Sequence, residues 1–341
     1  MPAKRPQSCK WLSEREAFTA FATHTGKIES AGHIKPLHWY VASRLVVEGG
    51  FNPDWITPRP PFKLAPKGKK TERRYSLVYD PMVATGGEQT ILGGLKTKNV
   101  DVVVSVPGIG PVLAVSCKGV TKAFRNLTNR MEETIGECTN LHITYPALVV
   151  GYFAVLRANR DLEDAAEAPI LDEAEDAAAE TPESKQEAAS MLEDAEHSDE
   201  TPKETAGSVA RSSKNDLAFG PAGDVTEGIA RFHAALSEMT GRRGIRDEIS
   251  RYEAMTTVLV EPKGPNAGAA SEFPPVSSAL HLSRFFSTLY QRYEERFVYG
   301  APVLSGQTAR YFWDAESPAF NTEADTDGVP QLDYPRRLGS E

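Results

Sequence analysis

The sequence contains little cysteine and shows no metal-ligand spacing. Its 341 residues include only three cysteines, an odd number without the pattern of a disulfide framework or a metal site: Cys9, Cys117 and Cys138. Three of the histidines do not lie at metal-ligand spacing from these cysteines: His33, His38 and His142. We therefore do not expect a zinc site. Free thiols in such small number are typical of the reducing cytoplasm.

Long hydrophobic runs are also lacking. No stretch of 18 apolar residues is present, so we do not expect a transmembrane helix. The first residues, MPAKRPQSCKW, lack the apolar segment of a secretory signal. We therefore expect a cytoplasmic protein that does not associate with a membrane.

Negative charge is concentrated in one segment of the chain. The whole sequence has 38 Lys and Arg against 47 Asp and Glu, a net charge of −9. Residues 161–205 contain 17 acidic residues and 2 lysines, a net of −15, which leaves +6 (−9 minus −15) for the remainder. A mildly basic remainder is compatible with a nucleic-acid partner.

Residues 99–118, NVDVVVSVPGIGPVLAVSCK, predict a β-hairpin. Val100–Val106 and Val112–Cys117 are apolar runs, and a Pro- and Gly-rich pentapeptide between them provides the turn. Both runs are apolar on both faces, which is typical of central strands covered on each side. A carboxylate at Asp101 and an amine at Lys118 are costly in such strands unless something compensates them. The two ionisable groups therefore indicate a functional site.

This arrangement resembles the PD-(D/E)xK nuclease superfamily, which has the restriction-endonuclease-like fold. The resemblance covers about residues 35–157 and consists of an Asp on one strand followed by x-Lys at the end of the next. Ser116-Cys117-Lys118 has Ser where the pattern usually has an acid. This variant is similar to that of the NgoMIV-type restriction endonucleases, in which a Glu on the following helix reaches back into the site.

The resemblance implies a magnesium-dependent endonuclease. Asp101 and the migrated acid Glu132 would hold Mg²⁺, with the backbone carbonyl of Cys117 as a further ligand. Ser116 would either contact the metal ion or one of its bound waters, or serve as a small residue that leaves room for Glu132. Lys118 would orient the attacking water and stabilise the charge that develops on the phosphate.

Further acids and several basic residues are secondary candidates. Glu133 points about 100° away from Glu132 on a helix, so only one of them can face the site, and we prefer Glu132. In many superfamily members, a Glu on the helix before the sheet lines the site. The resemblance therefore implies that Glu48 is an accessory ligand. Contacts to the DNA backbone are expected from the basic residues around the hairpin: Lys96, Lys98, Lys122, Arg125 and Arg130. Cleavage of both strands of double-stranded DNA favours a homodimer.

The periodicity of the chain predicts the order helix, three strands, helix, strand. A capping box at Ser13 opens a short first helix that precedes this core. The predicted core elements are a helix from Pro36 to Gly49-Gly50, a strand over 74–80, the hairpin, a helix over 120–137 and a strand over 147–156, with a loop over 51–72. This is the αβββαβ order of a restriction-endonuclease-like α/β fold, a mixed central sheet flanked by helices.

Composition divides the chain into four parts. We expect N-terminal helices and the nuclease core over 1–157, an acidic insertion over 158–215, a C-terminal α/β part over 216–320 that packs on the core, and a loose tail over 321–341. The acidic insertion has no aromatic residue and too little apolar surface to offset chain entropy, so we expect it to be disordered.

A rival motif and two other functions stay open. Glu261-Pro262-Lys263 contains a literal Glu-x-Lys after an apolar strand, but Pro262 cannot donate to a sheet ladder and no Asp-bearing strand directly precedes it. The main expectation is a type II restriction enzyme or another phage-defence nuclease that hydrolyses DNA phosphodiesters. The alternatives are a DNA-binding protein without catalysis on the same fold, and a subunit of a larger defence complex that docks through the acidic stretch.

Overall fold

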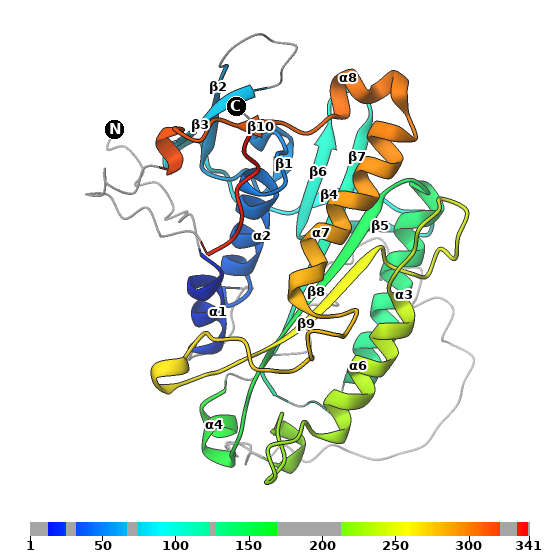
Figure 1. The fold of residues 1–341 in the computed structure, drawn as a ribbon. Helices are drawn as coiled ribbons and strands as arrows, with labels where there is room; N and C mark the ends of the chain where they lie inside the picture. The colour runs from blue at the N-terminus through cyan, green and yellow to red at the C-terminus, as the bar shows by residue number, and fades with distance from the viewer. Residues whose placement is uncertain are drawn as a thin grey trace, which may run out of the picture.

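The chain folds around one five-stranded mixed sheet (Figure 1). Its strand order is β1-β6-β7-β8-β9, and these strands span Ile56–Thr57, Val102–Val106, Gly110–Val120, Val149–Arg157 and Ala254–Val260. β6 is antiparallel to both β1 and β7, whereas β7, β8 and β9 are parallel. The computed structural model describes residues 13–24, 32–66, 74–122, 124, 127–168, 213–320 and 333–339.

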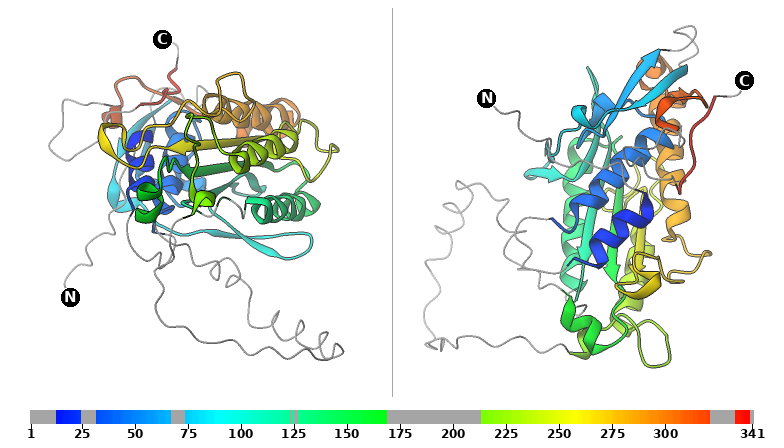
Figure 2. Two further views of the ribbon diagram at one scale, coloured as in Figure 1. Left: turned by 90° about the horizontal axis from the view of Figure 1, so that it is seen from below. Right: turned by 90° about the vertical axis from the view of Figure 1, so that its left-hand side faces the viewer.

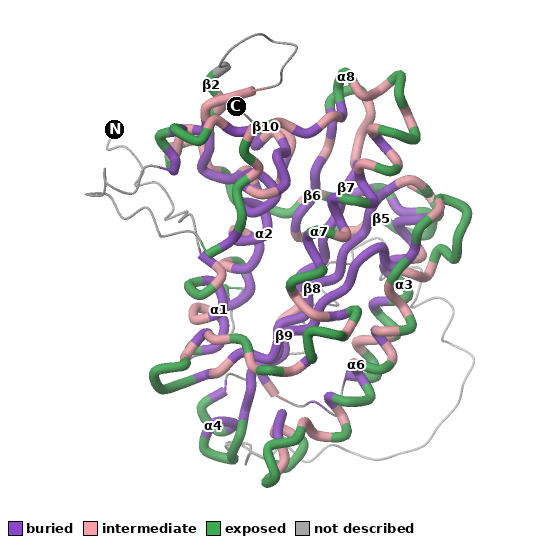
Figure 3. Tube along the Cα trace, viewed as in Figure 1, coloured by how far each residue is buried: buried purple, intermediate pink, exposed green. Residues whose placement is uncertain are grey.

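The parallel strands are apolar on both faces because both faces are covered. All nine residues of β8 and all seven of β9 are buried (Figure 3). Parallel neighbours need long crossover connections, and the helices in those crossovers provide the cover. The prediction of an α/β protein with a mixed sheet between helices is confirmed.

Helices pack on the two faces of this sheet, with α1 and α2 on one side and α3 and α6 on the other (Figure 1). α7 packs on the same face as α1 and α2. The bounds of these helices are Glu14–Ala22 (α1), Lys35–Val47 (α2), Leu127–Thr144 (α3), Glu227–Met239 (α6) and Leu282–Tyr293 (α7). α1 and α2 lie side by side (Figure 2). In β8, Phe153 joins the core on the α2 side and Tyr152 the core on the α3 side, as strand alternation requires.

The N-terminal helices begin and end where the sequence predicts. The Ser13 hydroxyl accepts the N–H of Glu16, and the Glu16 carboxylate accepts the N–H of Ser13 at 2.9 Å, which completes the capping box. α2 has Pro36 in its first turn and ends before Gly49, and Gly50 takes a positive φ of 70°.

The helix after the hairpin begins later than predicted. β7 continues to Val120, and α3 begins at Leu127 and ends at Thr144. Its buried face includes Cys138 and Leu141, whereas Ile135 is 41% exposed. Because Val120 is the last residue of β7, the predicted start of the helix at residue 120 was wrong.

The first strand of the main sheet also differs from the prediction. Residues 74–80 contain β3 (Arg74–Tyr79), which pairs with β2 (Phe62–Pro66) and β10 (Phe312–Trp313) in a separate sheet. β1, inside the predicted loop, pairs with β6 instead. The order helix, three strands, helix, strand is therefore formed by α2, β1, β6, β7, α3 and β8, with β2 to β5 inserted after β1.

The hairpin has the register that its central turn predicts. Val102 pairs with Val115 and Val103 with Ala114, so that paired numbers sum to 217 in both cases. Its first strand is interrupted at Asp101, which lies in a bend between β5 (Thr97–Val100) and β6. β5 leaves the main sheet to pair with β4 (Gln89–Leu92).

The start of the expected acidic insertion belongs to the folded part. α4 (Leu162–Glu167) lies within it, and Asp164 is 3% exposed with its carboxylate 2.8 Å from Lys263 Nζ. Residues 169–212 lie outside the described residues, so the expected disorder there is untested. The C-terminal part shares the core, because β9 is a strand of the main sheet.

The expected C-terminal tail is described only over residues 333–339. These residues lie against the N-terminal helices, since the N–H of Arg337 donates to the carbonyl of Val47 at 2.9 Å and Tyr334 is 6% exposed. The Asp333 carboxylate accepts the N–H of Glu14 at 2.9 Å, at the start of α1. Residues 321–332 and 340–341 lie outside the described part of the chain.

Candidate functional site

Asp101 lies where β5 leaves the main sheet and β6 begins. The pairing of β6 with β7 starts at Val102 and Val115. Beyond this point the Asp101 carboxylate takes the place of a backbone partner, because its Oδ2 accepts the N–H of Cys117 at 2.7 Å. The break in the predicted strand therefore fixes a carboxylate against the Ser-Cys-Lys end of β7.

Lys118 influences this carboxylate from the same end of β7. It is half-buried and in phase with Ala114, which belongs to the core on the α3 side. Burial raises the pKa of Asp101 to about 6, and the positive charge of Lys118 opposes that rise. Asp101 is thus ionised at neutral pH, and the charge of Lys118 acts on it from the end of the neighbouring strand.

His38 is the residue of α2 that meets Asp101, and the sequence analysis missed it. Its Nε2 lies 3.6 Å from Asp101 Oδ1, and the side chain is almost fully buried. Burial is the main cause that lowers the pKa of His38 to about 4; the charge of Glu88 opposes this shift and that of Lys118 adds to it, so the imidazole is neutral at pH 7. The position of His38 on the buried stripe with Val41 and Leu45 was the available signal.

Ser116 and Cys117 lie on opposite faces of β7. Ser116 is 2% exposed and pairs with Tyr152 of β8, and within the described part of the chain its hydroxyl oxygen has no hydrogen-bond partner. Cys117 belongs to the core on the α2 side. The sequence analysis assigned its backbone carbonyl to a metal, but the structure brings its thiol into a group with His38 and Asp101.

The predicted accessory acid Glu48 is bound elsewhere. Its carboxylate pairs with Arg44, one turn earlier on α2. Arg44 in turn contacts Glu14 of α1 at 3.2 Å. Ten residues separate Glu48 from His38, which is about 15 Å along a helix, so the structure does not bring Glu48 to Asp101.

The acids of α3 divide into an exposed pair and a buried residue. Glu132 and Glu133 are both exposed, and Glu133 pairs with Arg130 at 3.1 Å. Glu137, one turn further, is 8% exposed, and its charge raises the pKa of Asp101. The sequence analysis missed Glu137, although its place beside Cys138 on the buried face could have indicated it.

The predicted DNA-contacting lysines before Asp101 lie on the β4–β5 hairpin, whose tip is bound to α3. The Asn140 side chain accepts the N–H groups of Leu95 and Lys96 at 2.8 and 3.1 Å and donates to the Lys96 carbonyl at 2.8 Å. Lys98 Nζ lies 3.5 Å from the Glu137 carboxylate. A Cβ on Gly94 would lie 2.0 Å from Ile143, so this close approach requires glycine.

The other predicted contacts and the rival motif are placed less centrally. Lys122 follows β7, and burial lowers its pKa, while Arg125 lies outside the described residues. Glu261 of the rival Glu-x-Lys pairs with Arg160, and Lys263 pairs with Asp164. The two charged residues of the rival motif therefore have separate partners.

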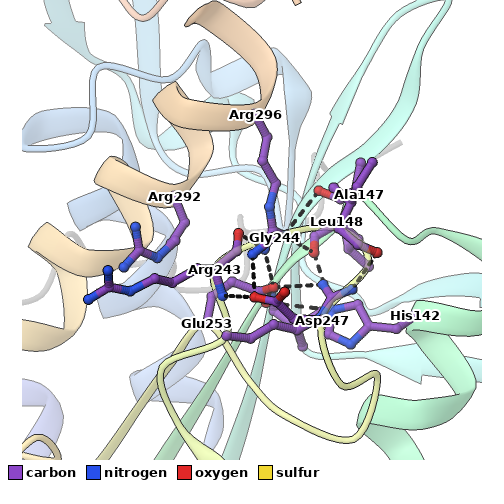
Figure 4. Close-up of polar contacts among 12 residues, drawn as sticks. His142, Ala147, Leu148, Arg243, Gly244, Asp247, Glu253, Arg292 and Arg296 are labelled. Atoms are coloured by element: carbon purple, nitrogen blue, oxygen red, sulfur yellow. Dashed lines mark hydrogen bonds and ion pairs between the residues drawn. The ribbon is translucent and has the colours of Figure 1, made fainter. Parts of the chain in front are cut away.

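A second cluster of charged groups lies near the other end of the parallel strands. Glu253 is fully buried and accepts hydrogen bonds from Val150 N–H at 2.7 Å, Arg242 at 2.9 Å and Arg296 at 2.6 Å, with His142 Nε2 at 3.5 Å (Figure 4). Burial raises the pKa of Glu253, but the His142 hydrogen bond and the Arg296 charge outweigh it and lower the pKa.

This second cluster is separate from the site at Asp101. Lys118 pairs with Ala154 of β8, four positions beyond Val150, which is about 13 Å along a strand. The side chains of the Glu253 cluster come from four places: α3, the segment after α6, the residue before β9 and the π-helical turn Glu294–Tyr299. The cluster thus joins four elements, which is a structural role.

Comparisons of the chain with protein-family models, with curated proteins and with solved structures found no match. Within the described ranges, none of the helices combines the length and the apolar character needed to cross a membrane. The geometry at Asp101 is therefore the observation from which a function can be inferred.

Proposed function

We propose that the chain is a metal-dependent endonuclease that hydrolyses DNA phosphodiester bonds on a restriction-endonuclease-like core. The observation that supports this most is the Asp101 carboxylate, which accepts the N–H of Cys117, the residue immediately before Lys118. The charge of Lys118 also acts on this carboxylate, and a carboxylate with a lysine in electrostatic reach is suited to phosphoryl chemistry. A restriction or other phage-defence enzyme, acting in the cytoplasm on double-stranded DNA as a homodimer, is the setting that we propose.

The residues at the site fit a divalent metal ion. Asp101 offers a carboxylate oxygen that the Cys117 N–H does not occupy, and Glu137 adds a second negative charge nearby. A bound ion would polarise the phosphate and lower the pKa of its water. Lys118 would orient the attacking water and stabilise charge on the phosphate. Carboxylate ligands alone favour Mg²⁺.

The direct test is cleavage of plasmid DNA by the purified chain with Mg²⁺ or with EDTA. We expect cleavage only with the metal ion. Lys118→Met keeps the aliphatic stem and removes the charge, so we expect the rate to fall by about 10²- to 10³-fold. Lys263→Met is the matched control, because Lys263 belongs to the rival motif, and it should cut at the parental rate. Loss of cleavage in Lys263→Met but not in Lys118→Met would reject the site.

The acid that completes the site is tested on α3. Glu137 is the buried acid of α3 whose charge acts on Asp101, so Glu137→Gln should abolish cleavage and leave DNA binding largely intact. Glu132, which the sequence favoured, is exposed together with Glu133, so Glu132→Ala and Glu133→Ala should cut DNA at close to the parental rate. Rates of nicking and filter-binding affinities measure the two effects separately. Parental cleavage by Glu137→Gln together with inactive Glu132→Ala would return the role to Glu132.

A further inference from the structure

We propose that His38, Asp101 and Cys117 form a binding site for a divalent transition-metal ion such as Co²⁺ or Zn²⁺. One ligand atom of each residue lies within 4.8 Å of the other two. The three residues come from α2, from the bend before β6 and from β7, so the fold brings together a histidine and a cysteine whose spacing in the sequence gave no reason to expect a zinc site. The inference rests on the proposed function and extends it, because the Asp101 carboxylate that would hold Mg²⁺ would hold a softer ion when His38 and Cys117 also bind it.

The imidazole of His38 is the group that points to a ligand. It is 5% exposed, and its Nε2 has no hydrogen-bond partner among the residues that the structure describes. Asp101 Oδ1, at 3.6 Å, is too distant for a hydrogen bond. A buried polar atom without a partner costs about 1–3 kcal/mol. A metal ion between the nitrogen and the carboxylate removes that cost.

The separations suit a metal ion. Ligands held at about 2.0–2.3 Å by one tetrahedral ion lie about 3.3–3.8 Å apart. The 3.6 Å between His38 Nε2 and Asp101 Oδ1 falls in this range. Asp101 Oδ2 is fixed by the Cys117 N–H at 2.7 Å, which leaves Oδ1 for the ion. The thiol needs to approach by at most about 1 Å, which a small side-chain rotation provides.

The donor set selects the class of ion. Mg²⁺ binds oxygen ligands and dehydrates reluctantly. Imidazole suits Zn²⁺ and other transition ions, and a thiolate favours the softer members of that group. The thiol of Cys117 releases its proton when the ion binds. A nitrogen, an oxygen and a sulfur ligand together therefore favour a transition-metal ion over Mg²⁺.

A titration of the full chain with Co²⁺, followed by absorption spectroscopy, tests the site. A thiolate on Co²⁺ gives a charge-transfer band in the near ultraviolet, and tetrahedral Co²⁺ gives d–d bands in the visible. We expect both from the wild-type chain. Cys117→Ser should lose the charge-transfer band, and His38→Gln should weaken Co²⁺ binding by at least about 10-fold.

Two cysteine variants are the matched controls. Cys138 Sγ lies 3.4 Å from His142 Nδ1, yet this pair has no third ligand among the described residues. Cys138→Ser and Cys9→Ser should therefore keep the charge-transfer band. A band that survives Cys117→Ser, or a wild-type chain without Co²⁺ bands, overturns the proposal. Circular dichroism checks folding, and if His38→Gln does not fold, the Cys117→Ser spectrum decides.

The result is distinguishable from that of the cleavage assay. A chain that binds Co²⁺ through Cys117 and His38 but cuts no DNA supports the metal site and rejects the nuclease. Conversely, Mg²⁺-dependent cleavage that His38→Gln and Cys117→Ser leave at the parental rate, with no Co²⁺ bands, supports the nuclease and rejects the transition-metal site.

Discussion

Asp101→Asn is expected to lower the rate of DNA cleavage by at least about 10³-fold while it raises the free energy of unfolding at pH 7 by about 2 kcal/mol. The amide cannot replace the carboxylate as a metal ligand, so catalysis is lost. Its oxygen still accepts the N–H of Cys117, and its NH₂ group can donate to the unpartnered Nε2 of His38. The variant therefore keeps the local structure.

The gain in stability follows from the pKa of Asp101. Its folded value of about 6 lies above the ordinary value of 3.8, so folding favours the neutral carboxyl. The contribution of the neutral Asp101 carboxyl to the free energy of unfolding is fully present below pH 3.8 and is lost as the pH rises through about 6. Above that pH, burial of the ionised carboxylate lowers the free energy of unfolding by up to about 3 kcal/mol. The asparagine stays neutral throughout. The difference in unfolding free energy should therefore shrink as the pH falls from 7 to 4.

Urea denaturation at several pH values measures this difference, and Asp247→Asn is the matched control. Hydrogen bonds from the N–H groups of Gly244 and Arg243 lower the pKa of Asp247, so its amide variant should show no gain. If Asp101→Asn cuts DNA at the parental rate, Asp101 is not a metal ligand. If Asp101→Asn is less stable than the wild type at pH 7, the buried carboxylate is not a cost to folding.

The second large effect is expected from the cluster around Glu253. Glu253→Ala should lower the free energy of unfolding by about 3–5 kcal/mol, because it leaves Arg242 and Arg296 buried without their shared carboxylate. The N–H of Val150 also loses its acceptor. Urea denaturation at pH 7 gives the magnitude.

Glu248→Ala is the control for this variant. Glu248 is exposed and pairs with Arg251 on the surface, so its loss should cost less than about 1 kcal/mol. The folded fraction of Glu253→Ala should cut DNA at the parental rate, because the cluster lies about 13 Å along the strands from Lys118. A loss of less than 1 kcal/mol in Glu253→Ala would mean that the arginines find other partners.

The hairpin could be predicted because its information is local. Two apolar runs and the Gly-rich turn between them determine the register, and Val102 opposite Val115 follows from the position of the turn. Asp101 and Lys118 could be named for the same reason, as costly groups inside apolar strands. The two-residue strand β1 has too little sequence to carry a pattern, so the longer β3 was assigned to its place.

The residues that meet Asp101 from other elements could not be predicted in this way. His38 reaches Asp101 because of the way α2 packs on the sheet. That packing depends on residues far apart in the sequence, so a local sequence pattern does not predict it. Glu137 was missed because the helix was expected to begin at residue 120, whereas it begins at Leu127. An error in the starting residue of a helix changes which acid faces the sheet, since each residue rotates by about 100°.

The late position of β9 in the chain affects how the protein is made. β8 ends at Arg157 and its parallel neighbour β9 begins at Ala254, 97 residues later (254 minus 157). At about 5–20 residues per second, a ribosome needs about 5–20 s to synthesise that interval. During this time β8 has an open edge on the nascent chain, with apolar side chains on both faces. The sheet is therefore open to aggregation during synthesis, and chaperone binding to ribosome-bound chains is expected to decline once β9 has emerged.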